Sequence, residues 1–189
     1  MDSTRKIVFD TVRLTIRLAA VEDVDFFYQL WRNPQVMIYV GFPQGLPITR
    51  AEIQDRLAAA GMSPFNRLLV IDLNSTGQSI GECHMHAPNP NGIASTDVKL
   101  LPAFWGYRYG IEVKRGLLDY IFTYTNAAAV EATPNVNNVA SIKMQETVGA
   151  KRAGETVHQF PSSMQGYTTP VHAYIYRVSR VDWQSPTHK

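Results

Sequence analysis

The chain has 189 residues, of which 45% are hydrophobic and 18% are charged, as in a folded globular domain and unlike a disordered chain. A formal net charge of +2 is too small to indicate a nucleic-acid-binding surface, and no apolar run approaches the roughly 20 residues of a membrane span. Cys83 is the only cysteine, which excludes an internal disulfide and a cysteine-rich zinc site. Residues 1–6 lack the core of a signal peptide, so we expect a cytoplasmic protein with no membrane or nucleic-acid partner.

The first third of the chain predicts a strand followed by two helices. Residues 12–18 alternate polar and apolar side chains, which indicates a half-buried strand. Residues 20–32 follow with early acidic and later aromatic side chains, typical of a helix, and Asn33-Pro34 should end it. A loop rich in glycine, proline and apolar side chains spans residues 39–47. Thr49 can then cap a helix that continues to about residue 60.

The middle of the chain predicts three strands and a long helix. Residues 68–73 and 79–86 form a hairpin, and residues 93–101 form the third strand. An aromatic, glycine-containing turn leads from this strand into a helix whose buried face carries Val113, Leu117, Ile121 and Tyr124. A turn of this kind leaves N–H groups unpaired at the helix start, where an anion such as phosphate is favoured. An ordinary strand–helix connection is the alternative.

The last third predicts a short strand over residues 128–133 and a helix capped by Asn138 and ended by Gly149. Two closing strands, near residues 151–158 and 171–178, bracket a loop. Adjacent strands interrupted by helices predict an α+β domain built on one mixed sheet.

Two segments carry a family resemblance. Residues 100–113 read Leu-Leu-Pro-Ala-Phe-Trp-Gly-Tyr-Arg-Tyr-Gly-Ile-Glu-Val, and residues 138–149 read Asn-Val-Ala-Ser-Ile-Lys-Met-Gln-Glu-Thr-Val-Gly. In this order they resemble the Gcn5-related N-acetyltransferase (GNAT) superfamily, in its branch of RimJ/RimL-type ribosomal-protein N-terminal acetyltransferases. The resemblance implies one GNAT-like domain over residues 1–189, with its core at about 12–178. It also implies a three-layer α/β arrangement, in which helices cover both faces of a mixed, mostly antiparallel sheet that splays at the cofactor site.

The resemblance implies transfer of an acetyl group from acetyl-coenzyme A to a primary amine, by direct attack in a ternary complex. The acceptor is expected to be a small molecule or a protein N-terminus, with a slight preference for the small molecule. A coenzyme-A-binding protein without acetyl transfer is the alternative, and other thioester chemistry on the same fold is a third possibility. The positions that match the family's cofactor contacts are Leu100, Leu101, Trp105, Gly106, Tyr107, Arg108, Tyr109, Gly110, Asn138 and Ser141.

Two positions depart from the family pattern. Arg108 replaces the middle glycine of the phosphate loop, where its side chain either obstructs the pyrophosphate or adds a cation beside it, and we favour the added cation. Gln145 stands where many relatives have a tyrosine that protonates the leaving thiolate, and an amide cannot do so at neutral pH.

Ser141 and His84 are the candidate catalytic residues. In this branch of the family the serine is a candidate proton donor to the thiolate; a hydroxyl bonded to the helix backbone is the alternative reading. His84 shares a strand face with Glu82 and His86, and an ordinary imidazole pKa of about 6.5 would suit amine deprotonation. Asp97, Ser95 or a water chain are alternatives for the general base. No third ligand for a metal accompanies the histidines, so no metal site is expected.

The acceptor pocket is expected, from the family fold, between the early helices and the late loop. Its candidate lining is Tyr39 and Phe42 on one side and Phe160, Met164 and Tyr167 on the other. The alternative is that these side chains close small cores beneath their loops. Because no acidic cluster accompanies the loops, an acceptor that is apolar around its amine fits better than a polyamine. The protein is expected to be a monomer or homodimer.

Overall fold

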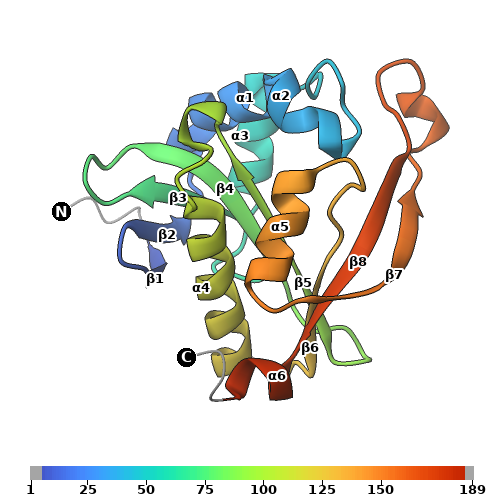
Figure 1. The fold of residues 1–189 in the computed structure, drawn as a ribbon. Helices are drawn as coiled ribbons and strands as arrows, with labels where there is room; N and C mark the ends of the chain where they lie inside the picture. The colour runs from blue at the N-terminus through green and yellow to red at the C-terminus, as the bar shows by residue number, and fades with distance from the viewer. Residues whose placement is uncertain (1–5, 186–189) are drawn as a thin grey trace.

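The computed structural model describes residues 6–185. Of residues 1–6, in which we expect no signal peptide, all but the last lie outside the described residues. Eight strands form one sheet in the order β1-β2-β3-β4-β5-β6-β8-β7 (Figure 1). Within residues 6–185, β5 and β6 are the one parallel pair, and every other neighbouring pair is antiparallel. The expected mixed, mostly antiparallel sheet is therefore confirmed. The strands are β1 (Ile7–Asp10), β2 (Leu14–Leu18), β3 (Arg67–Leu73), β4 (Ser79–His86), β5 (Ile93–Leu100), β6 (Ala129–Ala132), β7 (Lys151–His158) and β8 (Val171–Ser179).

Helices cover both faces of this sheet, as expected. The α-helices are α1 (Val24–Arg32), α2 (Pro34–Met37), α3 (Arg50–Ala58), α4 (Tyr109–Tyr124), α5 (Val139–Thr147) and α6 (Arg180–Gln184). Short 3-10 helices add η1 (Val21–Asp23), η2 (Ile38–Val40), η3 (Pro102–Phe104) and η4 (Ser162–Met164). Among residues 6–185, none of the helices has both the length and the apolar character needed to cross a bilayer.

Helices α2 and α3 begin at polar caps. The Thr49 hydroxyl accepts a hydrogen bond from the Glu52 amide at 3.3 Å, and the Glu52 carboxylate accepts one from the Thr49 amide at 2.8 Å. Asn33 ends α1 as expected, but its side chain also accepts from the Gln35 amide at 2.9 Å. With proline favoured at the first helical position, Asn33-Pro34 therefore starts the short helix α2, which the sequence reading missed.

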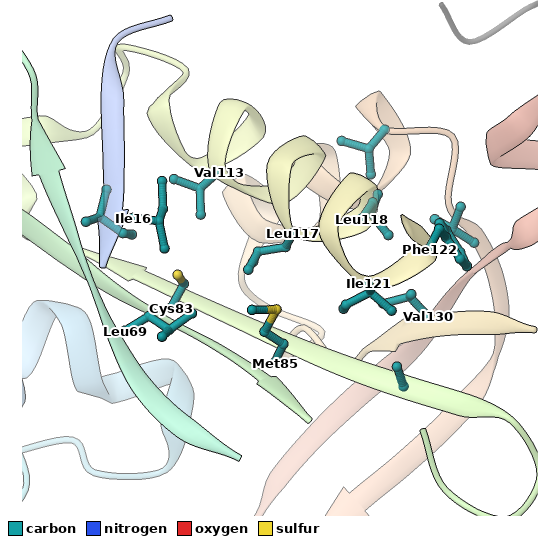
Figure 2. Close-up of a cluster of buried hydrophobic side chains, with 14 of the residues drawn as sticks. Ile16, Leu69, Cys83, Met85, Val113, Leu117, Leu118, Ile121, Phe122 and Val130 are labelled. Atoms are coloured by element: carbon teal, nitrogen blue, oxygen red, sulfur yellow. The ribbon is translucent and has the colours of Figure 1, made fainter. Parts of the chain in front are cut away.

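Helix α4 packs one face of the sheet (Figure 2). Its buried face includes Val113, Leu117 and Ile121, which contact a core that also contains Cys83 and Met85 of β4. Tyr124, expected on this face, is instead 68% exposed, because it lies at the last residue of the helix and packs on Tyr120. Burial of this face is the main stabilising contribution that the sequence predicts for the long helix.

Helices α1 and α3 pack the opposite face. Phe27 and Leu30 of α1 and Ile53 and Leu57 of α3 are buried together with Val70 of β3. On β3, Leu69 and Ile71 alternate with Val70 and lie in the core beneath α4. The strand is thus apolar on both faces because helices cover both.

The sheet splays beside β5. Strand β5 pairs with β6 only at residues 93–95, while β4 pairs with β5 as far as Leu100. Since β6 ends at Ala132, residues 96–100 of β5 have no strand neighbour on that side within the described chain. Their backbone N–H and C=O groups on this edge are left for another partner.

Candidate functional site

A cleft of about 870 Å³ opens at the splay. Its floor includes residues 97–100 of β5, and its walls come from two sets of elements. We call the loop 101–108 with the starts of α4 and α5 the helix-start half. We call the side formed by α2, η2, the β6–α5 loop, the end of β7 and Phe160 the aromatic half.

The turn into α4 is shaped by two left-handed residues. Gly106 has φ 83° and Arg108 has φ 64°, and Arg108 directly precedes the first residue of the helix. The indole N–H of Trp105 donates to the Leu100 carbonyl at 2.8 Å and ties the turn to the end of β5. The amides of the first helical turn and the positive end of the helix dipole therefore face the cleft, an arrangement that favours an anion.

Arg108 has a left-handed backbone conformation, which glycine adopts without strain. A left-handed conformation costs a residue with a side chain about 1 kcal/mol relative to glycine. Arg108 lines the cleft and is solvent-exposed, so it is a cation beside the helix start and is not buried in the protein.

Eight of the ten candidate cofactor positions line the cleft, and two do not. Leu101 is only 7% exposed and packs in the core beneath α1, because the chain turns inward after β5. Tyr107 is 59% exposed and stacks on Tyr109 outside the cleft, with ring centroids 5.7 Å apart. Those in the lining are Leu100, Trp105, Gly106, Arg108, Tyr109, Gly110, Asn138 and Ser141.

Asn138 and Ser141 lie together at the start of α5. The Asn138 side-chain oxygen accepts from the Ser141 amide at 3.1 Å, which is the expected N-cap. The Ser141 hydroxyl has no protein partner within residues 6–185, so the backbone bond that would give it a purely structural role is not formed. Gln145, one helical turn further, is 3% exposed and does not line the cleft.

His84 does not line the cleft. Its ring packs edge-on against His86, with centroids 4.4 Å apart, and its Nε2 is buried without a partner in the described part of the chain. Burial, followed by the neighbouring His86, lowers the pKa of His84 to about 4. The imidazole is therefore neutral at pH 7 and a weaker base than expected. Within residues 6–185, no three potential metal-ligating side chains cluster.

The aromatic candidates form two layers. Tyr39 and Phe160 line the cleft, whereas Phe42, Met164 and Tyr167 do not. Phe42 is 7% exposed and supports Phe160 from behind, with ring centroids 5.2 Å apart, and it also stacks on Tyr167 at 6.4 Å. The outer layer is thus a small core beneath the loops, which was the alternative reading.

Gly41 allows the two loops of the aromatic half to meet. Its φ is 95°, and a Cβ there would lie 2.5 Å from the Phe160 ring. The Gly41 carbonyl accepts from the Thr169 amide at 2.9 Å, and the Tyr39 carbonyl accepts from Asn135 Nδ2 at 3.3 Å. Three segments distant in sequence are therefore joined on this side of the cleft.

Three charged residues in the lining were missed or only weakly indicated by the sequence. Lys143 follows Ser141 by two positions on α5, which could have suggested a second cation near the helix start. Asp97 and Lys99 lie on β5 opposite His84 and Glu82 of β4. That register depends on strand pairing and is not readable from either strand alone.

Lys99 connects two carboxylates. Its Nζ is paired with Asp97 and lies 3.1 Å from Glu82 Oε1. Burial lowers the pKa of Lys99, but the carboxylates of Asp97 and Glu82 outweigh it and raise that pKa above its ordinary value. Loss of solvent raises the pKa of Asp97, yet the Lys99 ammonium prevails and lowers it. Both groups stay charged at neutral pH.

Comparison with known proteins gives the same fold. The Bacillus licheniformis protein described as uncharacterized N-acetyltransferase p20 is 29% identical over 149 residues, which cover 76% of this chain and 82% of that protein. The spermidine N-acetyltransferase of Vibrio cholerae, solved with CoA and spermine, superposes with a TM-score of 0.76 at 19% identity and covers 93% of this chain and 100% of its own. A GNAT-family acetyltransferase from Bacillus anthracis gives a TM-score of 0.75 at 18% identity, over 91% of this chain and 98% of that chain.

A family model described as the acetyltransferase (GNAT) domain matches residues 13–151. That range contains β2 to α5 and hence the turn, the splay and both helix starts of the cleft. The chain therefore belongs to the GNAT acetyltransferase family.

Proposed function

We propose that this protein transfers an acetyl group from acetyl-coenzyme A to the primary amine of a small molecule or a protein N-terminus. The observation that carries the proposal is the meeting of the unpaired edge of β5 with the start of α4 in one cleft. The edge offers backbone partners to the amide groups of pantetheine. The helix start, with Arg108 and Lys143 in the lining, offers N–H groups and two cations to the phosphates.

The chemistry requires a neutral amine and a stabilised leaving group. The amine nitrogen attacks the thioester carbonyl carbon, the new N–C bond forms, and the C–S bond breaks with its electron pair on sulfur. We assign Ser141 as the proton donor to that thiolate, because its hydroxyl lies in the cleft without a protein partner among the described residues. The amine loses one proton to solvent before it attacks and a second one afterwards, and the Ser141 oxygen takes a proton back from solvent, so the hydroxyl is restored. The general-base role of His84 stays a prediction. Two observations do not favour it: the pKa of His84 is about 4, and the residue lies outside the cleft lining.

Motif similarity also supports membership of the RimJ/RimL-type branch. In the spermidine N-acetyltransferase solved with CoA and spermine, an amine acceptor accompanies the same fold. We propose an amine acceptor here on the same grounds, and a monomer or homodimer as the active form.

Binding of coenzyme A without transfer is the second candidate, because Gln145 cannot replace the family's tyrosine and is buried away from the cleft. Isothermal titration with acetyl-coenzyme A and with coenzyme A tests cofactor binding, which both candidate functions require. We expect micromolar binding, on the order of −8 kcal/mol. Absence of binding by either ligand contradicts both candidates. Thiol release that requires an added amine, with an N-acetyl product seen by mass spectrometry, then separates the enzyme from the binding protein.

A further inference from the structure

Charge is distributed unevenly in the cleft. The cations Arg108 and Lys143 lie at the starts of α4 and α5, in the helix-start half. Among the described residues that line the cleft, Asp97 is the one carboxylate, and it lies further from α4 along β5 than Leu100. The side expected to hold phosphate is thus cationic, and the single anionic side chain is on the floor beyond it.

Asp97 is held in place by charged neighbours on β5 and β4. Lys99 bridges it to Glu82, whose side chain is only 5% exposed and accepts from Trp31 Nε1 at 3.0 Å. The Asp97 side chain is 55% exposed. Lys99 is shared between the two carboxylates, and Lys114, whose pKa burial lowers to about 7, interacts with Asp97 from α4. The Glu82 Oε2 atom is buried without a partner in the part of the chain that is described. The exposed edge of the Asp97 carboxylate is therefore the place on the floor where the ammonium group of a ligand can be paired.

The aromatic half of the cleft combines apolar side chains with polar ones, among them Gln35, Thr133 and Asn135. It contains no second carboxylate among the described residues, so a further ammonium group there would find hydrogen-bond partners but no ionic partner. A polyamine or aminoglycoside carries several ammonium groups and would leave most of them unpaired. The apolar and aromatic members of the aromatic half are Val36, Tyr39, Val40, Pro134 and Phe160, and Val171 of β8 also lines the cleft.

We infer that the acceptor is a small primary amine with a single positive charge and an apolar, ring-sized body, and that the Asp97 carboxylate binds its ammonium group before transfer. This inference rests on the proposed acetyl transfer. Asp97 acts as a specificity-determining residue: it selects and places the amine, while the aromatic half covers the body of the acceptor.

An acceptor panel with acetyl-coenzyme A tests the substrate class. The probes are 2-phenylethylamine and tyramine, against spermidine, kanamycin and a short peptide with a free N-terminus, followed by thiol release and product mass. We expect kcat/KM for 2-phenylethylamine to exceed that for spermidine and kanamycin by at least about 100-fold. Equal or better use of a polycation or of the peptide overturns the inference. So does acetyl-coenzyme A binding with no panel amine acetylated, whereas failure to bind acetyl-coenzyme A overturns the proposed function itself.

Substitution of Asp97 tests the residue. Asp97→Asn should raise KM for 2-phenylethylamine by about 30-fold, with kcat changed less than threefold and the Kd of acetyl-coenzyme A unchanged. The unchanged Kd also shows that the variant folds. Asp97→Glu, which keeps the charge, should recover part of the loss. Asp55→Asn removes an exposed carboxylate on α3 outside the cleft and should leave all three constants as in the wild type. A KM unchanged in Asp97→Asn overturns the assignment.

Discussion

The two halves of the cleft are built in different ways. The helix-start half comes mainly from one continuous stretch, the loop after β5 and the start of α4, with the start of α5 beside it. Its chemistry, together with that of the free β5 edge on the floor, is mainly that of the backbone. The aromatic half joins η2, the β6–α5 loop and the segment after β7, and it is held by side-chain stacking and two loop hydrogen bonds. Backbone chemistry suits a ligand shared by a whole family, whereas convergent side chains suit an acceptor particular to one protein.

Gly110→Trp should break the helix-start half most completely. A Cβ at this position would already lie 3.1 Å from Met144 Sδ, so an indole must occupy the cleft between α4 and α5. We expect the affinity for acetyl-coenzyme A to fall by at least about 100-fold, or roughly 2.7 kcal/mol, in isothermal titration. Gly61→Trp is the control, because a Cβ there meets no atom within 4 Å. Wild-type affinity in Gly110→Trp would remove the turn from the cofactor site.

The difference between the halves also decides what the sequence could predict. Helix ends are predicted by single residues near them in the sequence, namely Thr49, Asn138 and Gly149, and the glycine turn is predicted by a few consecutive residues. The fold class followed from such local signals and the family resemblance, and eight of the ten candidate cofactor positions selected in this way line the cleft. By contrast, Phe42 and Phe160 are far apart in the chain, and which of them lines the cleft depends on how the two loops meet at Gly41. Strand register, which places Asp97 and Lys99 opposite His84 and Glu82, is likewise a property of the folded sheet.

Ser141→Ala sharpens the comparison by separating binding from chemistry within the helix-start half. The backbone contacts that we assign to the cofactor persist in this variant, and only the hydroxyl is removed. We expect kcat to fall by about 30-fold, with the Kd of acetyl-coenzyme A within twofold of the wild type. Thr147→Ala removes a hydroxyl from the same helix that bonds only to the Lys143 carbonyl, and it should keep wild-type kcat. Full turnover in Ser141→Ala would show that the Ser141 hydroxyl is not the proton donor to the thiolate.

His84 gives a test beside the floor of the cleft. Its pKa is about 4 in the folded state against 6.5 for the free group, so the folded protein binds fewer protons between these values. Stability from this group is complete above the unfolded pKa and is lost as the pH falls toward the folded pKa. Between about pH 7.5 and about pH 5.5 the wild type should lose about 1 kcal/mol more than His84→Gln in urea unfolding. An equal loss in both proteins would mean that the folded imidazole titrates normally, which would strengthen His84 as a general base.

At Arg108 the helix-start half offers a charged side chain in addition to its backbone groups. Two substitutions there measure how much this side chain adds to the affinity for acetyl-coenzyme A. Arg108→Ala and Arg108→Gly both remove the cation, so both should weaken acetyl-coenzyme A binding by about fivefold, or roughly 1 kcal/mol. Only glycine also relieves the left-handed backbone at φ 64°, so Arg108→Gly should be more stable than Arg108→Ala by about 1 kcal/mol in chemical denaturation.

The pair of variants distinguishes the two readings of this position. If the arginine obstructs the pyrophosphate, both substitutions tighten binding, and the site works by its backbone alone. If the arginine contacts the phosphates, glycine restores the relaxed turn yet still binds more weakly than the wild type. In that case the stability lost to the strained residue and the affinity gained from its charge are of similar size. The protein then retains a left-handed arginine because the guanidinium compensates, in the bound state, for the strain that it imposes on the turn.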